Sequence, residues 1–170
     1  MANPIDAAYD GLKALIAACP AFQTAVGAAN ANEALEHIYW PDVKRWPTEV
    51  GESIPQRPFC LIHENDDCAW SMDVNLVRAV GELYVFLEFP APEADLRSQE
   101  CLRAFTTRIG QILIEMCVLA GTDSPTGPWY WHITRIEKKA TPGLMVLAEN
   151  EEPNEEDEAF LGASYKVSWI

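Results

Sequence analysis

The residues best suited to metal chemistry form a short series in this sequence, Cys60, His63 and Cys68. Thiolate and imidazole are natural zinc ligands at short spacing. The series lacks a clear fourth partner, and the other cysteines form no C-x-x-C knuckle. A two-residue gap inside an extended strand also places ligands on alternating or distant positions rather than around one ion. We therefore expect no metal site and interpret these residues as structural.

A polar cluster occupies residues 63–67, with Asp73 nearby. Its carboxylates and imidazole could hold a divalent cation or serve in general acid and base catalysis. The order of residues does not match the zinc motif H-E-x-x-H, because Asp67 stands where the second histidine should be. Asn and Asp are ordinary turn residues, so the pattern favours a solvated turn.

Nucleophilic catalysis and nucleotide binding find little support in the sequence. Ser124 lies in a loop of Pro and Gly without a G-x-S-x-G elbow, and the chain has only three histidines. Neither phosphate-cradling pattern, G-x-x-x-x-G-K-[ST] or G-x-G-x-x-G, is present. An enzyme would need a pocket that collects four groups, His63, Asp66, Asp67 and His132. We expect no catalytic activity and no cofactor.

The formal net charge is -14, and no basic cluster is longer than the pair Lys138 and Lys139. Such a chain repels a phosphate backbone, so direct binding to nucleic acid or to an anionic membrane is disfavoured. The first residues lack the basic and apolar regions of a secretory signal, and no apolar run approaches the length of about 20 residues that spans a membrane. We expect the protein to be made and kept in a cytosol, with its five cysteines reduced.

Two features could make contact with a partner. Trp129 and Trp131 could form a stacking platform, although packing in the core on one face of a strand is the favoured interpretation. An acidic run at residues 149–158 cannot bury itself and should project as a solvated loop that a basic partner could recognise. Its candidate interaction residues are Glu151, Glu152, Glu155, Glu156, Asp157 and Glu158.

The first half of the chain alternates ordered and irregular segments. Apolar residues at steps of three and four predict a helix over residues 5–18, which Pro20 closes. Residues 34–40 fit either a helical turn or a strand. The prolines within 41–58 predict an irregular connection, and residues 59–63 follow as a short strand.

The second half carries the clearest elements. Residues 81–89 are rich in strand-forming types, and residues 92–121 show the period of an amphipathic helix capped by Gly121. A strand is expected at 129–136, an acidic projecting loop at 141–159 and a closing strand at 160–170. In that last strand Tyr165, Val167 and Trp169 alternate with polar residues.

This order predicts a single α+β domain over residues 1–170. A small antiparallel or mixed sheet should pack against the N-terminal helix and the long central amphipathic helix. The edges of such a sheet need partners, and a projecting loop suits assembly in which each subunit docks head-to-tail on its neighbour.

In the order and the kind of its expected helices and strands, the chain resembles the tail terminator, or tail-completion (neck), proteins of long-tailed bacteriophages. The resemblance rests on four segments that span most of the chain: a helix over 5–19, a strand over 83–89, a helix over 102–119, and a hairpin ending in Leu161-Gly-Ala-Ser-Tyr-Lys-Val-Ser-Trp169. No invariant motif accompanies it, and the Pro-rich stretch 41–58 departs from the group.

The resemblance implies a structural virion protein that forms a hexameric ring. Such a ring sits on the finished tail tube, stops its polymerisation and joins it to the head. Its partners would be copies of itself, the tail tube protein and a head-closure or neck protein, while DNA passes through the lumen without specific binding. Its location would be the tail or neck of the virion after synthesis in the cytoplasm of the bacterial host.

The main alternative is a small acidic binding protein of the cytosol, of the immunity or adaptor type, that neutralises a basic partner. Stoichiometry separates the two hypotheses. An immunity-type protein should be a monomer or dimer that binds one basic partner with strong salt dependence, whereas a terminator should form rings or attach to tubes.

Overall fold

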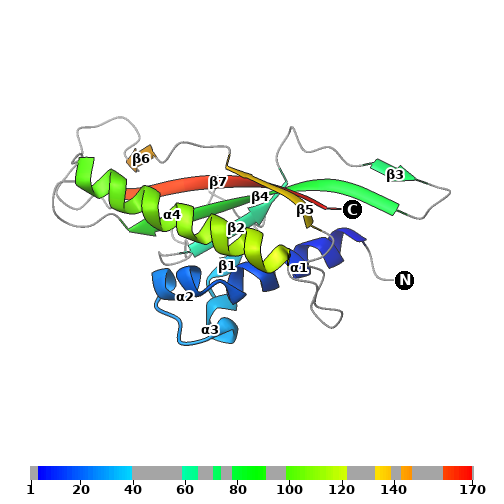
Figure 1. Ribbon diagram of the computed structural model, residues 1–170, viewed down its shortest axis with the longest axis horizontal. Helices are drawn as coiled ribbons and strands as arrows, with labels where there is room; N and C mark the ends of the chain where they lie inside the picture. Colours follow the sequence, from blue (N-terminus) through cyan, green and yellow to red (C-terminus); the bar gives the residue numbers. More distant parts are fainter. Residues whose placement is uncertain are drawn as a thin grey trace, which may run out of the picture.

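The computed structural model describes residues 4–39, 59–64, 71–73, 78–90, 99–121, 133–138, 143–146 and 159–169. Within these ranges the chain forms two layers, a sheet and a set of helices that covers one of its faces (Figure 1). The α+β class expected from the sequence is confirmed, as are its N-terminal and central helices. No helix in the described ranges is long and apolar enough to cross a membrane.

The helices are α1 (Pro4–Ala18), α2 (Pro20–Val26), α3 (Ala31–Leu35) and α4 (Gln99–Ala120). The strands are β1 (Ile38–Tyr39), β2 (Phe59–His63), β3 (Ser71–Asp73), β4 (Arg78–Pro90), β5 (Ile133–Lys138), β6 (Gly143–Val146) and β7 (Ala159–Trp169).

Pro20 has a second role that the sequence analysis missed. It follows the end of α1, as expected, but it also occupies the first turn of α2. Proline suits this position because its fixed φ is helical and the missing N–H would have no partner within the helix. Helix α2 then ends at Gly27, whose φ of 73° is the left-handed conformation that glycine adopts without strain.

Residues 34–40, which fitted either a helix or a strand, contain the end of α3 and the whole of β1. The carbonyl oxygen of the Asn30 side chain accepts hydrogen bonds from the backbone N–H groups of Asn32 and Glu33, which fixes the start of α3. The chain then turns within two residues and pairs β1 with β2.

The main sheet has the strand order β1-β2-β4-β7-β5, with β3 added to β4 and β6 added to β7. Its strands pair antiparallel except for β1 and β2, which are parallel, so the sheet is mixed. The longest pairing joins β4 to β7 and runs from Gly81 opposite Trp169 to Pro90 opposite Phe160. The C-terminal strand therefore lies in the middle of the sheet.

One face of the sheet is apolar and carries the core. Alternate residues of the central strands, Leu83, Val85 and Leu87 in β4 and Tyr165 and Val167 in β7, are buried there. The helices cover them with side chains at steps of three and four, as the sequence pattern predicted for α4. The buried helical residues are Leu12, Leu15, Ile16, Phe22, Phe105, Ile109, Ile112 and Met116.

Several predicted boundaries change in the structure. Residues 141–159 were expected to form a loop throughout, but Gly143–Val146 forms β6 and pairs with the start of β7. Gly121 follows α4 and donates its N–H to the carbonyl of Cys117, yet it does not adopt the left-handed conformation expected of a glycine cap. The connection 41–58, the acidic run 149–158 and both Trp129 and Trp131 lie outside the described residues.

A buried hydrogen bond crosses the core between its two layers. The hydroxyl of Tyr165, which is fully buried, donates a hydrogen bond of 2.6 Å to the carbonyl oxygen of Ile109 in α4. Because a carbonyl oxygen has two lone pairs, it can accept this bond in addition to one from its own helix. The contact fixes the position of α4 along the central strand β7.

Replacing Tyr165 with Phe should lower the free energy of unfolding by about 1–2 kcal/mol, since a buried hydrogen bond is lost and little volume changes. Urea denaturation followed by circular dichroism measures this loss. The matched control is Thr107→Ala in the same helix, because Thr107 also donates to a backbone carbonyl but is exposed. An equal loss in both variants would show that the buried hydrogen bond contributes no more to the free energy of unfolding than the exposed one.

Candidate interaction surfaces

The structure separates the two residues proposed as the start of a zinc site. Cys60 and His63 lie three residues apart in β2, so they belong to opposite faces of the sheet. Cys60 is fully buried in the core, where burial and the nearby Cys19 raise the pKa of its thiol. A protonated thiol within the apolar layer and an imidazole on the other face cannot bind one ion.

His63 lies instead beside an aromatic ring. Its imidazole stacks on Tyr84 of β4 with ring centroids 6.1 Å apart, and its Nδ1 lies 2.9 Å from the carbonyl oxygen of Glu64. The part of the chain that the structure describes holds no group of three or more His, Cys, Asp or Glu residues arranged for a metal ion. Asp73 is the last residue of β3. The other candidates for metal or catalytic chemistry lie outside the described part: Asp66, Asp67, Cys68, Ser124 and His132.

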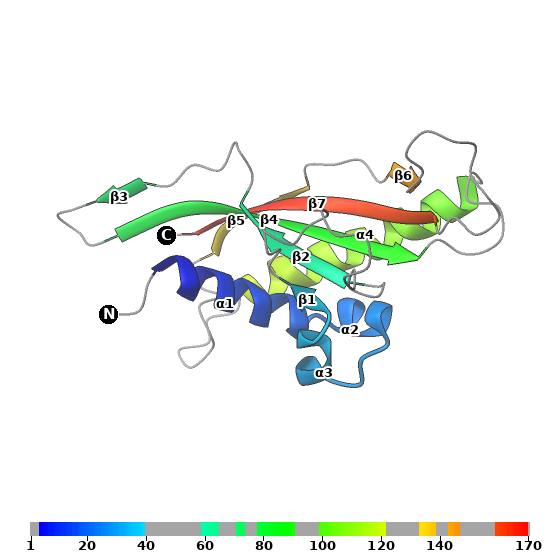
Figure 2. The same ribbon diagram turned by 180° about the vertical axis from the view of Figure 1, so that it is seen from behind.

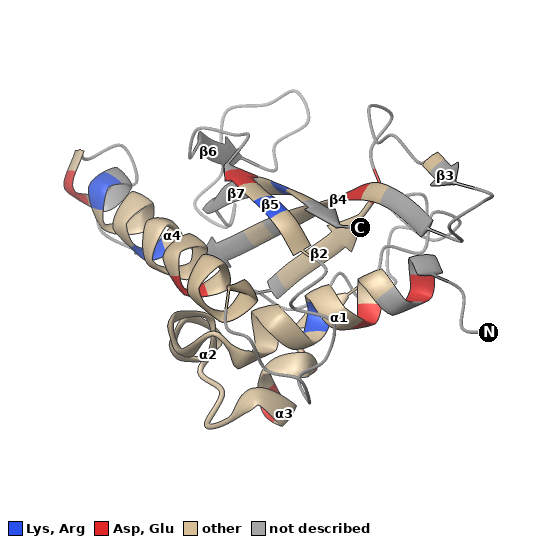
Figure 3. Cartoon of the chain, turned by 45° about the vertical axis from the view of Figure 1, so that its right-hand side comes forward, with Lys and Arg blue, Asp and Glu red and all other residues tan. Residues whose placement is uncertain are grey.

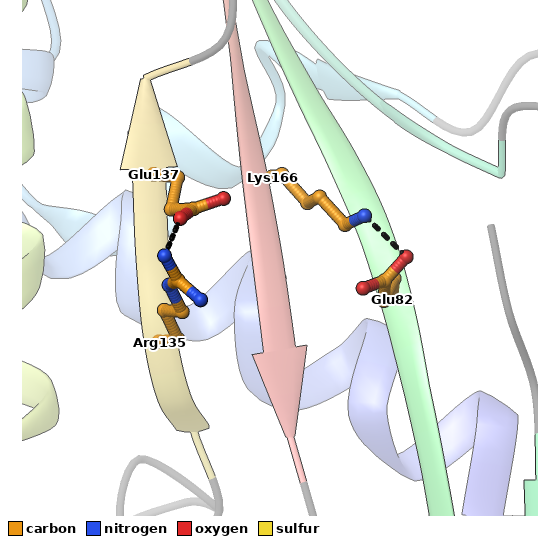
Figure 4. A network of polar contacts seen from close by, with 4 residues as sticks. All are labelled: Glu82, Arg135, Glu137 and Lys166. Atoms are coloured by element: carbon orange, nitrogen blue, oxygen red, sulfur yellow. Dashed lines mark ion pairs between the residues drawn. The ribbon is translucent and has the colours of Figure 1, made fainter. Parts of the chain in front are cut away.

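The sheet face opposite the helices carries charged side chains on three neighbouring strands, β4, β7 and β5. Lys166 in β7 forms an ion pair of 2.6 Å with Glu82 in β4, and on the next strand Arg135 pairs with Glu137 (Figure 4). The Lys166 and Glu82 side chains are only 17% and 23% exposed, so solvent screens their attraction less than at an open surface. A cross-strand pair of this kind contributes roughly 0.2–1 kcal/mol and favours the observed register.

A two-stranded arm extends from the sheet beyond the helical layer. It consists of β3 and the first residues of β4, with Ser71 opposite Val80 and Asp73 opposite Arg78 (Figures 1 and 2). The pairing of β4 with β7 begins only at Gly81, so within the described residues these positions of β4 pair with β3 alone. An isolated two-stranded ribbon is marginally stable in water, and packing against another surface would stabilise it.

The outer face of α4 combines exposed apolar and basic residues. Ile114 and Val118 lie one turn apart and are 58% and 60% exposed, and Cys117 between them is also exposed. Toward the start of the helix the same face carries Arg103 and Glu100, which are exposed. Exposed apolar side chains that line up on one helix face are typical of contact surfaces.

The carboxylate of Glu115 in α4 points toward α2 instead of this outer face. Its two oxygens accept hydrogen bonds from the backbone N–H of Ala21 at 2.7 Å and from the Gln111 side chain at 3.0 Å. An anion beside the first turn of a helix satisfies an N–H that has no partner within the helix. The carboxylate of Glu115 therefore holds α4 to α2 and does not belong to the exposed outer face of α4.

The sequence analysis did not find the apolar part of the α4 surface. Its interpretation used the amphipathic period of residues 92–121 and named no residue of the face opposite the core. The available signal was the spacing of Ile114 and Val118, which repeats every four residues but falls off the buried stripe of Ile109, Ile112 and Met116.

A scan of the sequence against protein-family models finds no match, and a search of curated proteins finds none either. The candidate surfaces are therefore argued from the geometry of this chain.

The buried thiols predict a loss of stability at alkaline pH. Burial, with a smaller effect of Glu115, raises the pKa of Cys19 from 9.0 to about 12, and the pKa of Cys60 is also raised. Above pH 9 the unfolded chain releases these protons while the folded chain keeps them. The free energy of unfolding should thus be constant below about pH 8 and should fall as the pH rises beyond 9, with a limiting slope of about 1.4 kcal/mol per pH unit for each thiol.

Urea unfolding under reducing conditions between pH 7.5 and 10 measures this slope. A double variant, Cys19→Ala with Cys60→Ala, should be less stable at neutral pH but should show a flatter dependence on pH. The control is Cys117→Ala: burial raises the pKa of this exposed thiol as well, but less than that of Cys19, so its removal should flatten the slope less than the double variant does. An unchanged slope in the double variant would rule out the two buried thiols as its cause.

Proposed function

We propose that this protein is a ring-forming structural subunit of a tailed phage, a tail terminator or neck protein that caps the tail tube and joins it to the head. The observation that carries the proposal is the arm of β3 and β4, a two-stranded ribbon that extends past the helical layer. A subunit that docks on its neighbour would stabilise such an arm.

The surface of the described residues favours assembly over catalysis. The side chains that could do chemistry are buried in the core, as Cys60 is, or engaged by neighbours, as His63 is. The outer face of α4, in contrast, exposes Ile114 and Val118, and the burial of apolar surface is the main favourable term in most protein association. We propose on these grounds that the protein is not an enzyme.

The net charge of -14 fits the same proposal. A ring on a tail tube has a lumen through which DNA must pass, and a negative wall would repel the phosphate backbone and keep DNA from binding. The proposed partners are copies of the chain, the tail tube protein and a head-closure protein, and the proposed location is the neck of the virion.

The test is the mass in solution, measured by light scattering after size exclusion at low and moderate salt over a wide range of protein concentration. We expect a species of about six times the chain mass of 19.0 kDa, which negative-stain electron microscopy should show as a closed ring. A chain that stays monomeric at every concentration and binds a single basic partner, with affinity that falls steeply with salt, would contradict the proposal. That outcome would support the acidic binding protein of the immunity type instead.

A further inference from the structure

The outer face of α4 carries a stripe of residues with a regular spacing. Its positions alternate in steps of four and three over about five helical turns, which keeps them in one line on the helix surface. The core residues of α4 lie on the opposite side of the helix. The outer stripe consists of Arg103, Thr107, Gly110, Ile114, Cys117 and Gly121, and Val118 lies beside it.

Among the described residues, no contact explains the glycine in the middle of this stripe. A Cβ atom built on Gly110 would meet nothing within 4 Å, so no neighbouring atom requires a glycine there. Gly110 lies inside α4, where glycine is less favourable than alanine. A glycine on an exposed helix face allows a second helix to approach closely, because the distance between two helix axes depends on the side chains at their contact.

The outer stripe is complementary to a reversed copy of itself. Its first half has the small residues Thr107 and Gly110, and its second half exposes the large apolar side chain of Ile114, with Val118 beside it. Two such helices can pack antiparallel about a two-fold axis level with position 112. Gly110 of one copy then lies opposite Ile114 of the other, which is the pairing of hole and knob that packed helices use.

The charges of α4 fit the same antiparallel pair. Glu100 lies in the first turn, where the partial positive charge of its own helix end attracts it. The last turn has no basic residue to meet the partial negative charge at that end, and Figure 3 shows the basic residues of α4 in its first half. In the antiparallel pair, Arg103 lies opposite Gly121 of the second copy, beside the last carbonyl groups of that copy's helix.

Net charge also favours this face for contact between two copies. The whole chain carries a charge of -14, so most approaches of a second copy meet repulsion. At the start of the outer face, the charges of Glu100 and Arg103 cancel, and the rest of the outer stripe is uncharged. Two copies that meet through α4 therefore avoid most of the repulsion between like charges.

We propose that α4 packs antiparallel against α4 of a second copy, with Ile114 of each copy against Gly110 of the other. The contact uses the same surface on both copies, so it closes at two copies and does not itself build a ring. It goes beyond the proposed function, because it joins two free subunits or two rings face to face. One helix from each copy makes a small interface, below about 1,200 Å² in total, so the self-association is weak.

A new thiol at position 107 tests the pairing directly. In the variant Thr107→Cys, the new thiol lies opposite Cys117 of the second copy, whereas the same two positions within one chain are about 15 Å apart and cannot be bridged. Diamide takes up the two electrons and two protons that the thiols release as the S–S bond forms. We expect a covalent species of two chains, in which peptide mapping by mass spectrometry finds position 107 joined to Cys117.

The matched control is Asn32→Cys, which places a thiol at an exposed position of α3, outside the proposed contact. Its link to Cys117 should form at least about tenfold more slowly, because it depends on random collision. Equal rates in the two variants would overturn the proposal. So would a map in which like positions are joined, 107 to 107 or 117 to 117, because that pattern indicates parallel helices.

A second change, Gly110→Leu in the Thr107→Cys chain, separates folding from association. Leucine favours the helix and meets no neighbour, so the melting temperature at low protein concentration should rise by about 2–4 °C. Its side chain occupies the space that Ile114 of the second copy needs, so the link from 107 to 117 should form at least about tenfold more slowly. Thr24→Leu adds the same side chain at an exposed position of α2 and should leave the rate unchanged. An unchanged or faster link with Gly110→Leu would contradict the proposed contact.

The outcomes distinguish this inference from the proposed function. A parent chain that forms rings, with a link from 107 to 117 no faster than in the control, would show that the α4 contact is wrong while the ring remains. A chain that gives the specific link but associates only into pairs would support the α4 contact and overturn the ring.

Discussion

The burial of one apolar sheet face beneath the helices is the constraint on which the rest of this structure depends. Strand β7 supplies Tyr165 and Val167 to that face, and α4 covers them with its own apolar stripe. The hydrogen bond from Tyr165 to the carbonyl of Ile109 then fixes where along β7 the helix lies. Hydrophobic burial supplies the stability but has no direction, so this one polar contact gives the packing a defined position.

The smaller helices are attached to this frame by polar groups at their ends. Glu115 of α4 accepts a hydrogen bond from the first turn of α2, and Pro20 occupies that turn without needing a partner for its nitrogen. The short loop from α2 to α3 ends at Asn30, whose side chain caps α3. The helical layer is thus held by a small number of specific contacts around a shared apolar core.

The two sides of the sheet differ in chemistry because only one is covered by helices. On the open face, Glu82 and Lys166 pair across neighbouring strands and support their register. The surfaces suited to a partner lie elsewhere, on the arm of β3 and β4 and on the outer face of α4. The apolar residues exposed on the outer face of α4 do not add to the core, so contacts with other molecules explain them more readily than folding does.

The sequence by itself determined the elements that are long enough for the side-chain period of a strand or helix to be recognised. The alternation of Tyr165, Lys166 and Val167 predicted β7, and the spacing of Phe105, Ile109, Ile112 and Met116 predicted α4, because side-chain direction repeats locally along a strand or helix. Only the tertiary structure decided that β7 pairs with β4, that β1 is parallel to β2 and that Gly143–Val146 is a strand. It also decided that α1 and α4 begin toward opposite ends of the molecule. These features depend on which distant segments reduce the free energy most by packing together, and a stretch of two to four residues is too short to carry a period that reveals its partner.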